Sequence, residues 1–332
     1  MTSEGAASGR SRVTVNTVTG PVAVDQLGRT LMHEHMQIGF PGWELDVLEP
    51  GPTRRDVIMR GVDRVHELQA GGFRSMVDPC PNDMGRDVEI MAEVSARTGF
   101  NVICATGFYH DGIAAPYWRM KVTQSADGPR RLAEFLTREL TVGVGDTGIK
   151  PGVIKVATGH GAVTPYETGL LQAAAMAAVA TGTPITTHTD GVLGPEQLRI
   201  LGETGCPPHR VIVGHSCGNP DPAYHRAIVD AGAYIGFDRF GLTMIRLDEG
   251  RIDSLLTLVR AGEIGRVIIS HDSPWCLRGS IWSGEALRTF TDLSPMHFSR
   301  NIVPRLKQFG MDDSHFDALL IDNPRNYFSG LS

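Results

Sequence analysis

The sequence contains no cluster of basic residues and no long apolar run. Lys and Arg are dispersed along the 332 residues and the net charge is −6 at pH 7, which argues against nucleic acids and acidic membranes as main partners. Since no segment of about 18 consecutive apolar residues occurs, we expect no transmembrane helix. The first segment, 1–12, is small and polar and lacks the apolar stretch of a signal peptide, so we expect a disordered leader there.

Cysteine is scarce and widely spaced. The chain has five cysteines, an odd number, and no Cys-x-x-Cys motif. This pattern predicts reduced thiols in a cytoplasmic protein, without a disulfide framework or a thiolate zinc site. The Gly-x-Gly-x-x-Gly turn that binds phosphate groups in doubly wound nucleotide-binding folds follows none of the strands predicted below.

The residues that are present predict a regular α/β architecture. With 41% hydrophobic and 20% charged residues, the composition is that of a globular protein with a large core. Residues 13–24 alternate between apolar and polar around a Gly-Pro turn, which predicts a short N-terminal β-hairpin. Eight apolar segments follow, most of them continuously apolar, as is typical of strands covered on both faces. They span 30–38, 73–78, 101–106, 152–157, 184–188, 210–214, 233–238 and 266–271.

Each of these eight segments is followed by a segment with helical spacing of its apolar residues. Eight β/α units without a break predict a closed (β/α)8 TIM barrel, as a single domain over residues 13–332. An open, doubly wound sheet is the structural alternative, and the missing Gly-x-Gly-x-x-Gly turn weakens it. The segment 273–295 reads as a long irregular loop.

Six polar residues stand out at or near the ends of these apolar strands, where a barrel carries its active site. Taken singly, each has an ordinary structural explanation, such as a hydrogen-bonded histidine or a capping aspartate. A lysine inside an apolar strand, however, costs several kcal/mol if it is charged and unpaired. Imidazole and carboxylate groups in this joint pattern, without cysteine, predict a site for Zn, Co, Mn or Fe. The six are His33, His35, Lys155, His188, His215 and Asp272.

The motifs that carry these residues, taken in order, resemble the phosphotriesterase family of the amidohydrolase superfamily. The resemblance extends from about Val15 to Phe328, and Thr106–Tyr109 and Gly236–Leu242 are similar to the phosphotriesterase-like lactonase branch in particular. The motifs are Leu31-Met-His-Glu-His35, Ile154-Lys-Val156, Thr187-His-Thr189, Gly214-His215 and Ser270-His-Asp272.

This resemblance implies a binuclear metal centre. His33, His35 and Asp272 would hold the buried ion, and His188 and His215 the more exposed one. Lys155 would be carboxylated by CO2 and would bridge both ions, which explains a lysine on an apolar strand. A hydroxide bridging the same two ions would attack the substrate directly, and Asp272 would accept the proton.

Further residues receive roles from the same resemblance. Tyr109 matches a tyrosine that contacts the substrate or the hydroxide, and Arg239 matches an arginine in the loop after the seventh strand. Their structural alternatives are a packed aromatic ring and an ion pair with Asp238. Trp275 and Trp282 are expected in the wall around the leaving group or acyl chain, with plain loop packing as the alternative for Trp275.

Three residues near the predicted ligands are expected to support the site without binding metal. Because side chains alternate along a strand, Glu34 and His271 should face away from the ligands beside them. Asp78, at the end of the second strand, is expected to be structural.

The sequence also departs from the family pattern. The acidic residue expected three positions after His215 is replaced by Gly218, with Asp221 following, so a proton relay through that carboxylate is not expected. The histidine found after the seventh strand in efficient organophosphate hydrolases is replaced by Arg239. We therefore expect phosphotriester hydrolysis to be a side activity.

The sequence thus predicts a metal-dependent lactonase or related carboxylic ester hydrolase acting on a small molecule. Within the family, an amidase, a carboxylesterase or a phosphotriesterase is the alternative. From a different class, the chain could be a non-catalytic barrel that binds a small ligand. The resemblance also implies a homodimer.

Overall fold

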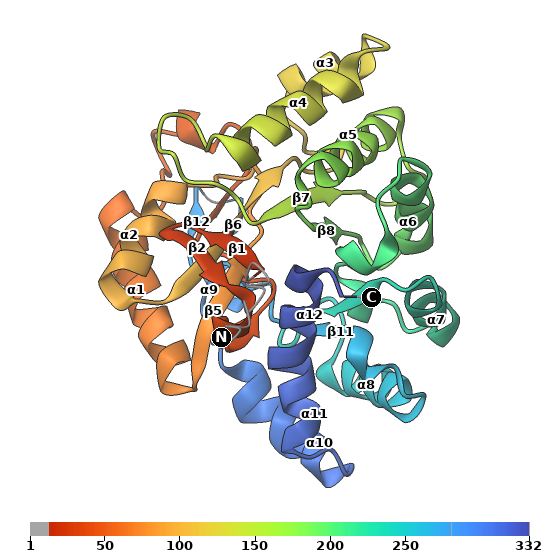
Figure 1. Ribbon diagram of the computed structural model, residues 1–332. Coiled ribbons are helices and arrows are strands. Elements are labelled where there is room, and N and C mark those ends of the chain that lie inside the picture. The colour runs from red at the N-terminus through yellow and green to blue at the C-terminus, as the bar shows by residue number, and fades with distance from the viewer. Residues whose placement is uncertain (1–12, 280, 332) are drawn as a thin grey trace, which may run out of the picture.

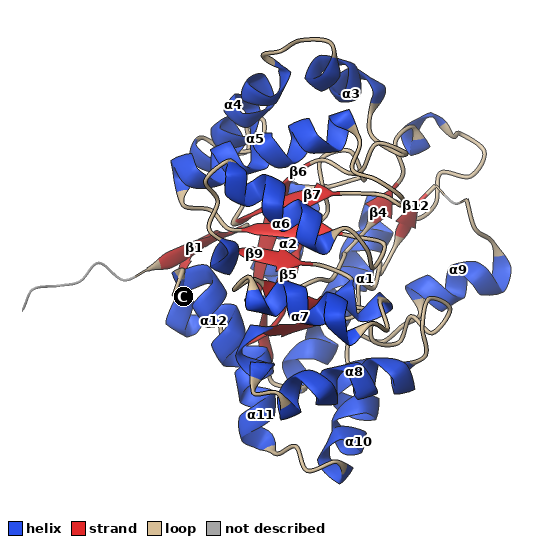
Figure 2. Cartoon of the chain, turned by 90° about the vertical axis from the view of Figure 1, so that its right-hand side faces the viewer, coloured by secondary structure: helices blue, strands red, loops and turns tan. Residues whose placement is uncertain are grey.

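Eight parallel strands surround a central axis, and helices cover the outside of this barrel (Figures 1 and 2). The computed structural model describes residues 13–279 and 281–331, so the leader expected over residues 1–12 lies outside the described residues. The strands pair in chain order, which confirms the predicted (β/α)8 architecture. They are β3 (Arg29–Leu31), β5 (Phe73–Asp78), β6 (Asn101–Gly107), β7 (Val153–Ala157), β8 (Ile185–His188), β9 (Val211–Val213), β10 (Tyr234–Phe237) and β11 (Val267–Ile269).

Backbone hydrogen bonds close the barrel between its first and last strands. The amide of Met32 donates to the carbonyl of Ile269 (3.4 Å), and the amide of Asp272 donates to the carbonyl of His33 (3.0 Å). This closure places the segment after β3 beside the segment after β11. Residues from opposite ends of the sequence therefore share one rim.

The predicted hairpin is confirmed, and it covers the amino-terminal end of the barrel. β1 (Thr14–Thr17) pairs antiparallel with β2 (Gly20–Ala23). Val15 and Val24 belong to the same apolar cluster as strand residues such as Val77. Figure 2 shows β1 at one end of the molecule and the rim strands β4 (Ile38–Gly39) and β12 (Leu277–Arg278) at the other. The carboxyl-terminal end of the barrel is therefore the end available to a ligand.

The helices begin where local signals predict them. Thr53 and Thr164 each form a capping box with the acidic residue three positions later. Among the described residues, no helix is both long and apolar enough to cross a membrane. The helices are α1 (Arg54–Ala70), α2 (Val88–Thr98), α3 (Pro116–Thr123), α4 (Gly128–Thr141), α5 (Pro165–Thr181), α6 (Gly194–Glu203), α7 (Pro222–Asp230), α8 (Asp248–Arg260), α9 (Gly284–Thr291), α10 (Val303–Gln308), α11 (Asp313–Asp317) and α12 (Asn323–Ser329).

The prediction of one continuous strand over 30–38 was wrong. β3 ends at Leu31, and the following backbone donors turn to other acceptors. The amide of His33 donates to the hydroxyl of Ser270 (2.9 Å), and the amide of Met36 donates to the carboxylate of Asp78 (2.8 Å). Side-chain acceptors thus alternate with backbone carbonyls here and interrupt the regular ladder, so both histidines lie on an irregular segment.

The loops at the rim contain more structure than predicted. α3 lies in the connection between β6 and β7, with Pro116 in its first turn. The segment 273–295 contains α9 and the short strand β12 (Leu277–Arg278), which pairs with β4 (Ile38–Gly39) outside the barrel. The pairing fixes this long connection across the rim.

Candidate metal centre

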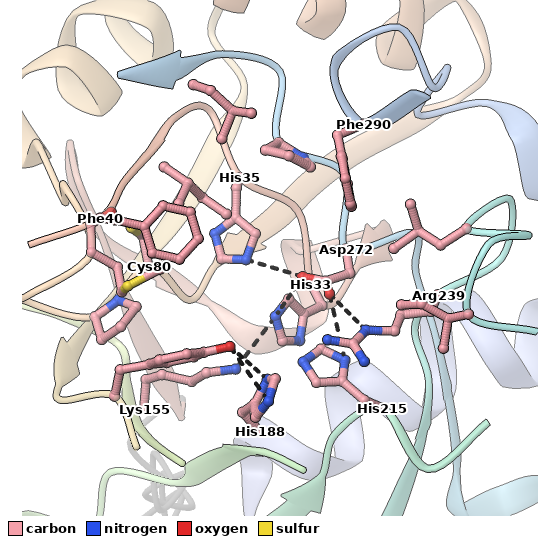
Figure 3. A pocket seen from close by; sticks show the side chains of 18 of the residues that line it. His33, His35, Phe40, Cys80, Lys155, His188, His215, Arg239, Asp272 and Phe290 are labelled. Carbon is pink, nitrogen blue, oxygen red and sulfur yellow. Dashed lines mark hydrogen bonds and ion pairs between the residues drawn. The ribbon is translucent and has the colours of Figure 1, made fainter. Parts of the chain in front are cut away.

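The carboxyl-terminal end of the barrel holds a cavity of about 120 Å³ (Figure 3). All six predicted metal ligands line it, together with Tyr109 and Arg239. Their side chains come from strands far apart in the sequence and point toward one another. The six are His33, His35, Lys155, His188, His215 and Asp272.

Two of these residues have an unusual backbone conformation. His215 and Asp272 follow β9 and β11 with φ angles of 59° and 53°. A left-handed conformation costs a residue other than glycine about 1–3 kcal/mol and is concentrated at functional sites. The chain turns sharply here, and both side chains reach the cavity.

Among the described residues, His33, His35 and Asp272 form one of three groups of His, Cys, Asp or Glu whose ligand atoms lie within 4.8 Å of one another. Oδ1 of Asp272 lies 3.2 Å from Nε2 of His35 and 3.4 Å from Nε2 of His33. In a tetrahedral zinc site with bonds of about 2.0–2.1 Å, ligand atoms are about 3.3 Å apart. The three residues therefore fit one divalent cation.

Lys155 lies beside the same group. It is on the fully buried strand β7, and its Nζ is 3.4 Å from Nε2 of His33. Burial lowers the pKa of Lys155 to about 8. At neutral pH roughly a tenth of such amines are uncharged.

Nδ1 of three of the histidines faces a carboxylate that is not one of the predicted ligands. Asp238 serves two rings, with Oδ1 3.0 Å from Nδ1 of His215 and Oδ2 3.4 Å from Nδ1 of His33. Asp78 Oδ1 lies 3.4 Å from Nδ1 of His35. Such carboxylates orient metal-binding histidines and select their tautomer. The signal in the sequence was the position of Asp78 and Asp238 at the ends of strands.

His188 is oriented differently. Its Nε2 lies 3.2 Å from Oδ1 of Asp190, and its Nδ1 lies 3.0 Å from the hydroxyl of Tyr109. Its ring is 4.6 Å from that of His215. Among the described residues, His188 belongs to none of the tight groups of three His, Cys, Asp or Glu ligand atoms. His188 and His215 are therefore close and both buried, but His188 is less tightly gathered with other ligand atoms than the members of the triad.

The charges of the site favour an ionised Asp272. Burial opposes ionisation, but the neighbouring His215 and Arg239 lower the pKa of Asp272 well below its usual range. Burial also opposes protonation of His35, yet its hydrogen bonds with Asp272 and Asp78 raise its pKa well above the usual value. Carboxylate and imidazole groups gathered in a buried site are the donor chemistry expected of a site for divalent metals.

Comparison with known proteins agrees with this geometry. The model of the phosphotriesterase family matches residues 13–328. The chain belongs to the phosphotriesterase family. It is 32% identical over 317 residues to the phosphotriesterase homology protein of Mycobacterium tuberculosis, covering 95% of this chain and 97% of the relative.

Solved structures of the phosphotriesterase family share the whole fold. The organophosphorus hydrolase from Deinococcus radiodurans has a TM-score of 0.91 and 39% identity, covering 98% of this chain and all of that chain. A variant of the PTE-like lactonase from the same organism has a TM-score of 0.90 and 39% identity, over 95% of this chain and all of that chain. The chain is therefore a hydrolase of a binuclear metal enzyme family, and the non-catalytic barrel is set aside.

An apolar wall stands over the polar floor of this phosphotriesterase-family site. Trp282 stacks on Phe290 with a centroid distance of 4.7 Å and meets Phe40 edge-on at 5.7 Å. All three line the cavity, with Leu242 and Leu277. The cavity thus combines a charged floor with an apolar side.

Trp275 does not share this wall, contrary to the expectation for it. Its side chain is fully buried in the hydrophobic core and is not among the residues that line the cavity. Its amide donates to the carbonyl of His35 (2.8 Å). That bond turns the residue inward, so Trp275 supports the rim from within the core.

The departures from the family pattern also have structural counterparts. Asp221 is exposed and caps α7 by accepting from the amide of Ala223 (2.9 Å), so it lies outside the cavity. Glu34 faces away from the cavity, as expected. Its Oε1 lies 2.7 Å from Nδ1 of His271 and accepts from the hydroxyl of Ser270 (2.9 Å).

Proposed function

We propose that this hydrolase is a metal-dependent lactonase or a related carboxylic ester hydrolase, with phosphotriester hydrolysis as a side activity. The observation that carries the proposal is the convergence of four histidines, Lys155 and Asp272 on one cavity with an apolar wall. The naming of one similar solved structure as a PTE-like lactonase supports the substrate class.

The ligand set fits two divalent cations, with Zn as first choice and Co, Mn or Fe as alternatives. When bound, such ions lower the pKa of water toward 7 and polarise a substrate oxygen. The triad of His33, His35 and Asp272 would hold one ion, and His188 with His215 the other. Lys155 would serve both after carboxylation.

Carboxylation of Lys155 requires the uncharged amine. The nitrogen lone pair forms a bond to the carbon of CO2 and one N–H proton leaves to solvent, which gives an anionic carbamate. The lowered pKa of Lys155 supplies the reactive form at neutral pH. An anion there would also remove the cost of an unpaired ammonium group on an apolar strand.

Asp272 and Tyr109 would move and position protons. Asp272 would accept a proton from the attacking water and pass it to the leaving group or to solvent. Burial raises the pKa of Tyr109, so its hydroxyl remains a hydrogen-bond donor at neutral pH. It would donate to an oxygen of the substrate.

The wall of Phe40, Trp282 and Phe290 favours a substrate with an apolar chain or ring. Arg239 would position the substrate beside Asp272. A phosphotriester remains the second candidate, since a similar solved structure is named an organophosphorus hydrolase. The family resemblance further suggests a homodimer, which sedimentation would test.

A substrate panel on the metal-loaded protein tests this proposal. Lactones of increasing chain length, aryl esters, N-acyl amides and dialkyl aryl phosphates would be compared by kcat/KM. We expect the highest values for lactones or esters. Turnover of an amide or a phosphotriester with no detectable lactone or ester hydrolysis would show that the proposed substrate class is wrong.

A further inference from the structure

Asp190 differs from the two other carboxylates that face the cavity histidines. Asp78 and Asp238 are fully buried at strand ends, whereas the Asp190 side chain is 23% exposed on the loop after β8. It faces His188 alone among the cavity histidines, at 3.2 Å from Nε2. Its other oxygen, Oδ2, lies 3.4 Å from Nε2 of His160, whose side chain is 80% exposed.

The partners of His188 determine its tautomer. A carboxylate only accepts hydrogen bonds, so Nε2 of His188 carries the hydrogen that points to Asp190. Nδ1 then keeps its lone pair and accepts from the hydroxyl of Tyr109 (3.0 Å), which lies farther from Nε2 (3.4 Å). In His33, His35 and His215 it is Nδ1 that faces a carboxylate. His188 therefore offers the cavity the opposite nitrogen from the other three rings.

The backbone of this loop is held by other side chains. Gln197 donates to the carbonyl of His188 (2.8 Å), and Asn219 donates to the carbonyl of Gly191 (2.7 Å). The hydroxyl of Thr189 donates to the carbonyl of Gly214 (2.9 Å). Removing the Asp190 carboxylate should therefore leave the loop in place and affect mainly the orientation of His188.

We propose that Asp190 is a positioning residue that fixes the tautomer and orientation of His188 and thereby sets the metal affinity of the exposed half of the site. The proposal rests on the proposed function for its metal-binding consequence. His160 lies on the other side of Asp190. Because its side chain is exposed, it contributes less than His188 to holding the Asp190 carboxylate in place. The tautomer itself is a property of the metal-free chain.

The first experiment reads the tautomer directly. Long-range ¹H–¹⁵N correlation spectra of the metal-free protein distinguish the two imidazole tautomers, and His188→Gln assigns the signal. We expect His188 with hydrogen on Nε2 in the wild type and a mixture of tautomers in Asp190→Ala. A wild-type His188 with hydrogen on Nδ1, or an unchanged tautomer in Asp190→Ala, would overturn the proposal.

The second experiment measures zinc binding of the whole chain by chelator competition. Asp146→Asn, an exposed change far along the chain, is the control. We expect two ions per wild-type chain. In Asp190→Ala the affinity for one ion should fall about 10–100-fold, the range for losing such a partner, while the other ion is unaffected. Asp190→Asn should lie between, because its amide oxygen still accepts a hydrogen bond.

The outcomes separate the two claims. If Asp190→Ala bound two ions with wild-type affinities, or lost affinity equally for both ions, the proposed role of Asp190 would be wrong. The binuclear proposal would be unaffected by either result. Fewer than two ions in the wild type would overturn the binuclear proposal. The tautomer spectra would still test whether Asp190 fixes the tautomer of His188. Equal thermal unfolding temperatures of the metal-free variants would establish that the fold is intact.

Discussion

Arg239 donates from Nε to Oδ2 of Asp272 at 2.8 Å, while the other oxygen of Asp272 faces the two histidines after β3. The carboxylate thus has a separate partner on each side. One oxygen is available to a metal, and the other is held by a cation that keeps the group ionised. Arg239 therefore acts directly on the residue proposed to carry the proton.

Replacing Arg239 should change the pH dependence of catalysis. Arg239 helps to lower the pKa of Asp272, so Arg239→Ala should raise that pKa. If the ionised carboxylate is required, the acidic limb of the kcat/KM profile shifts to higher pH, and activity at pH 7 falls about 10–100-fold. Arg226→Ala, on the exposed surface, is the control. An unshifted acidic limb would contradict this role.

Lys155→Ala should abolish most activity and reduce metal content, because the anionic bridge is lost. Short-chain carboxylic acids added to the buffer should restore part of both, since their carboxylate can take the place of the carbamate. Lys150→Ala, at an exposed lysine, should behave as the wild type. Full activity of Lys155→Ala without added acid would refute the bridging role.

The stability of the metal-free chain should rise with pH because of Lys155. Its pKa in the folded chain is about 8, below the ordinary lysine value of 10.5. Between these values the unfolded chain binds more protons, so the free energy of unfolding increases by up to about 1.4 kcal/mol per pH unit. Urea unfolding of wild type and Lys155→Met from pH 7 to 10.5 should show this rise only in the wild type. The same dependence of the free energy of unfolding on pH in both proteins would contradict the lowered pKa of Lys155.

Substitution of the two tryptophans after β11 should affect different properties of the protein. Trp282→Ala removes part of the cavity wall and should raise KM for long-chain substrates about 5–10-fold with little change in stability. Trp275→Ala empties a fully buried position and should lower the free energy of unfolding by about 3–5 kcal/mol. If Trp275→Ala does not fold, Trp275→Phe should show a smaller loss of the same kind with KM unchanged.

The barrel and the six residues on its rim were predictable because the apolar strands and helices alternate in phase. A polar side chain at the end of a buried strand is directed to the rim of the barrel, where it can meet solvent or a polar partner. The strand over 30–38 was overextended because Asp78 and Ser270, distant in sequence, supply the acceptors that end the ladder. The spacing of apolar residues along one segment does not indicate hydrogen-bond acceptors that lie far away in the sequence.

The supporting carboxylates could be placed only by the structure. Asp238 was considered as the partner of Arg239, yet it contacts His33 and His215, because its strand end faces those rings across the barrel. Asp190 lies two residues after His188 without any motif to mark it. Trp275 was expected at the wall, but its backbone bond to His35 turns it into the core. These outcomes depend on local backbone direction, which spacing alone does not fix.

The central claim is that these residues hold two metal ions. Its most direct test is the metal content of folded wild-type protein after zinc loading and removal of excess metal, measured by mass spectrometry against protein concentration. The account predicts two ions per chain, falling to about one in a variant that lacks His188 and His215. Fewer than two ions per chain in a fully folded, zinc-loaded preparation would contradict it.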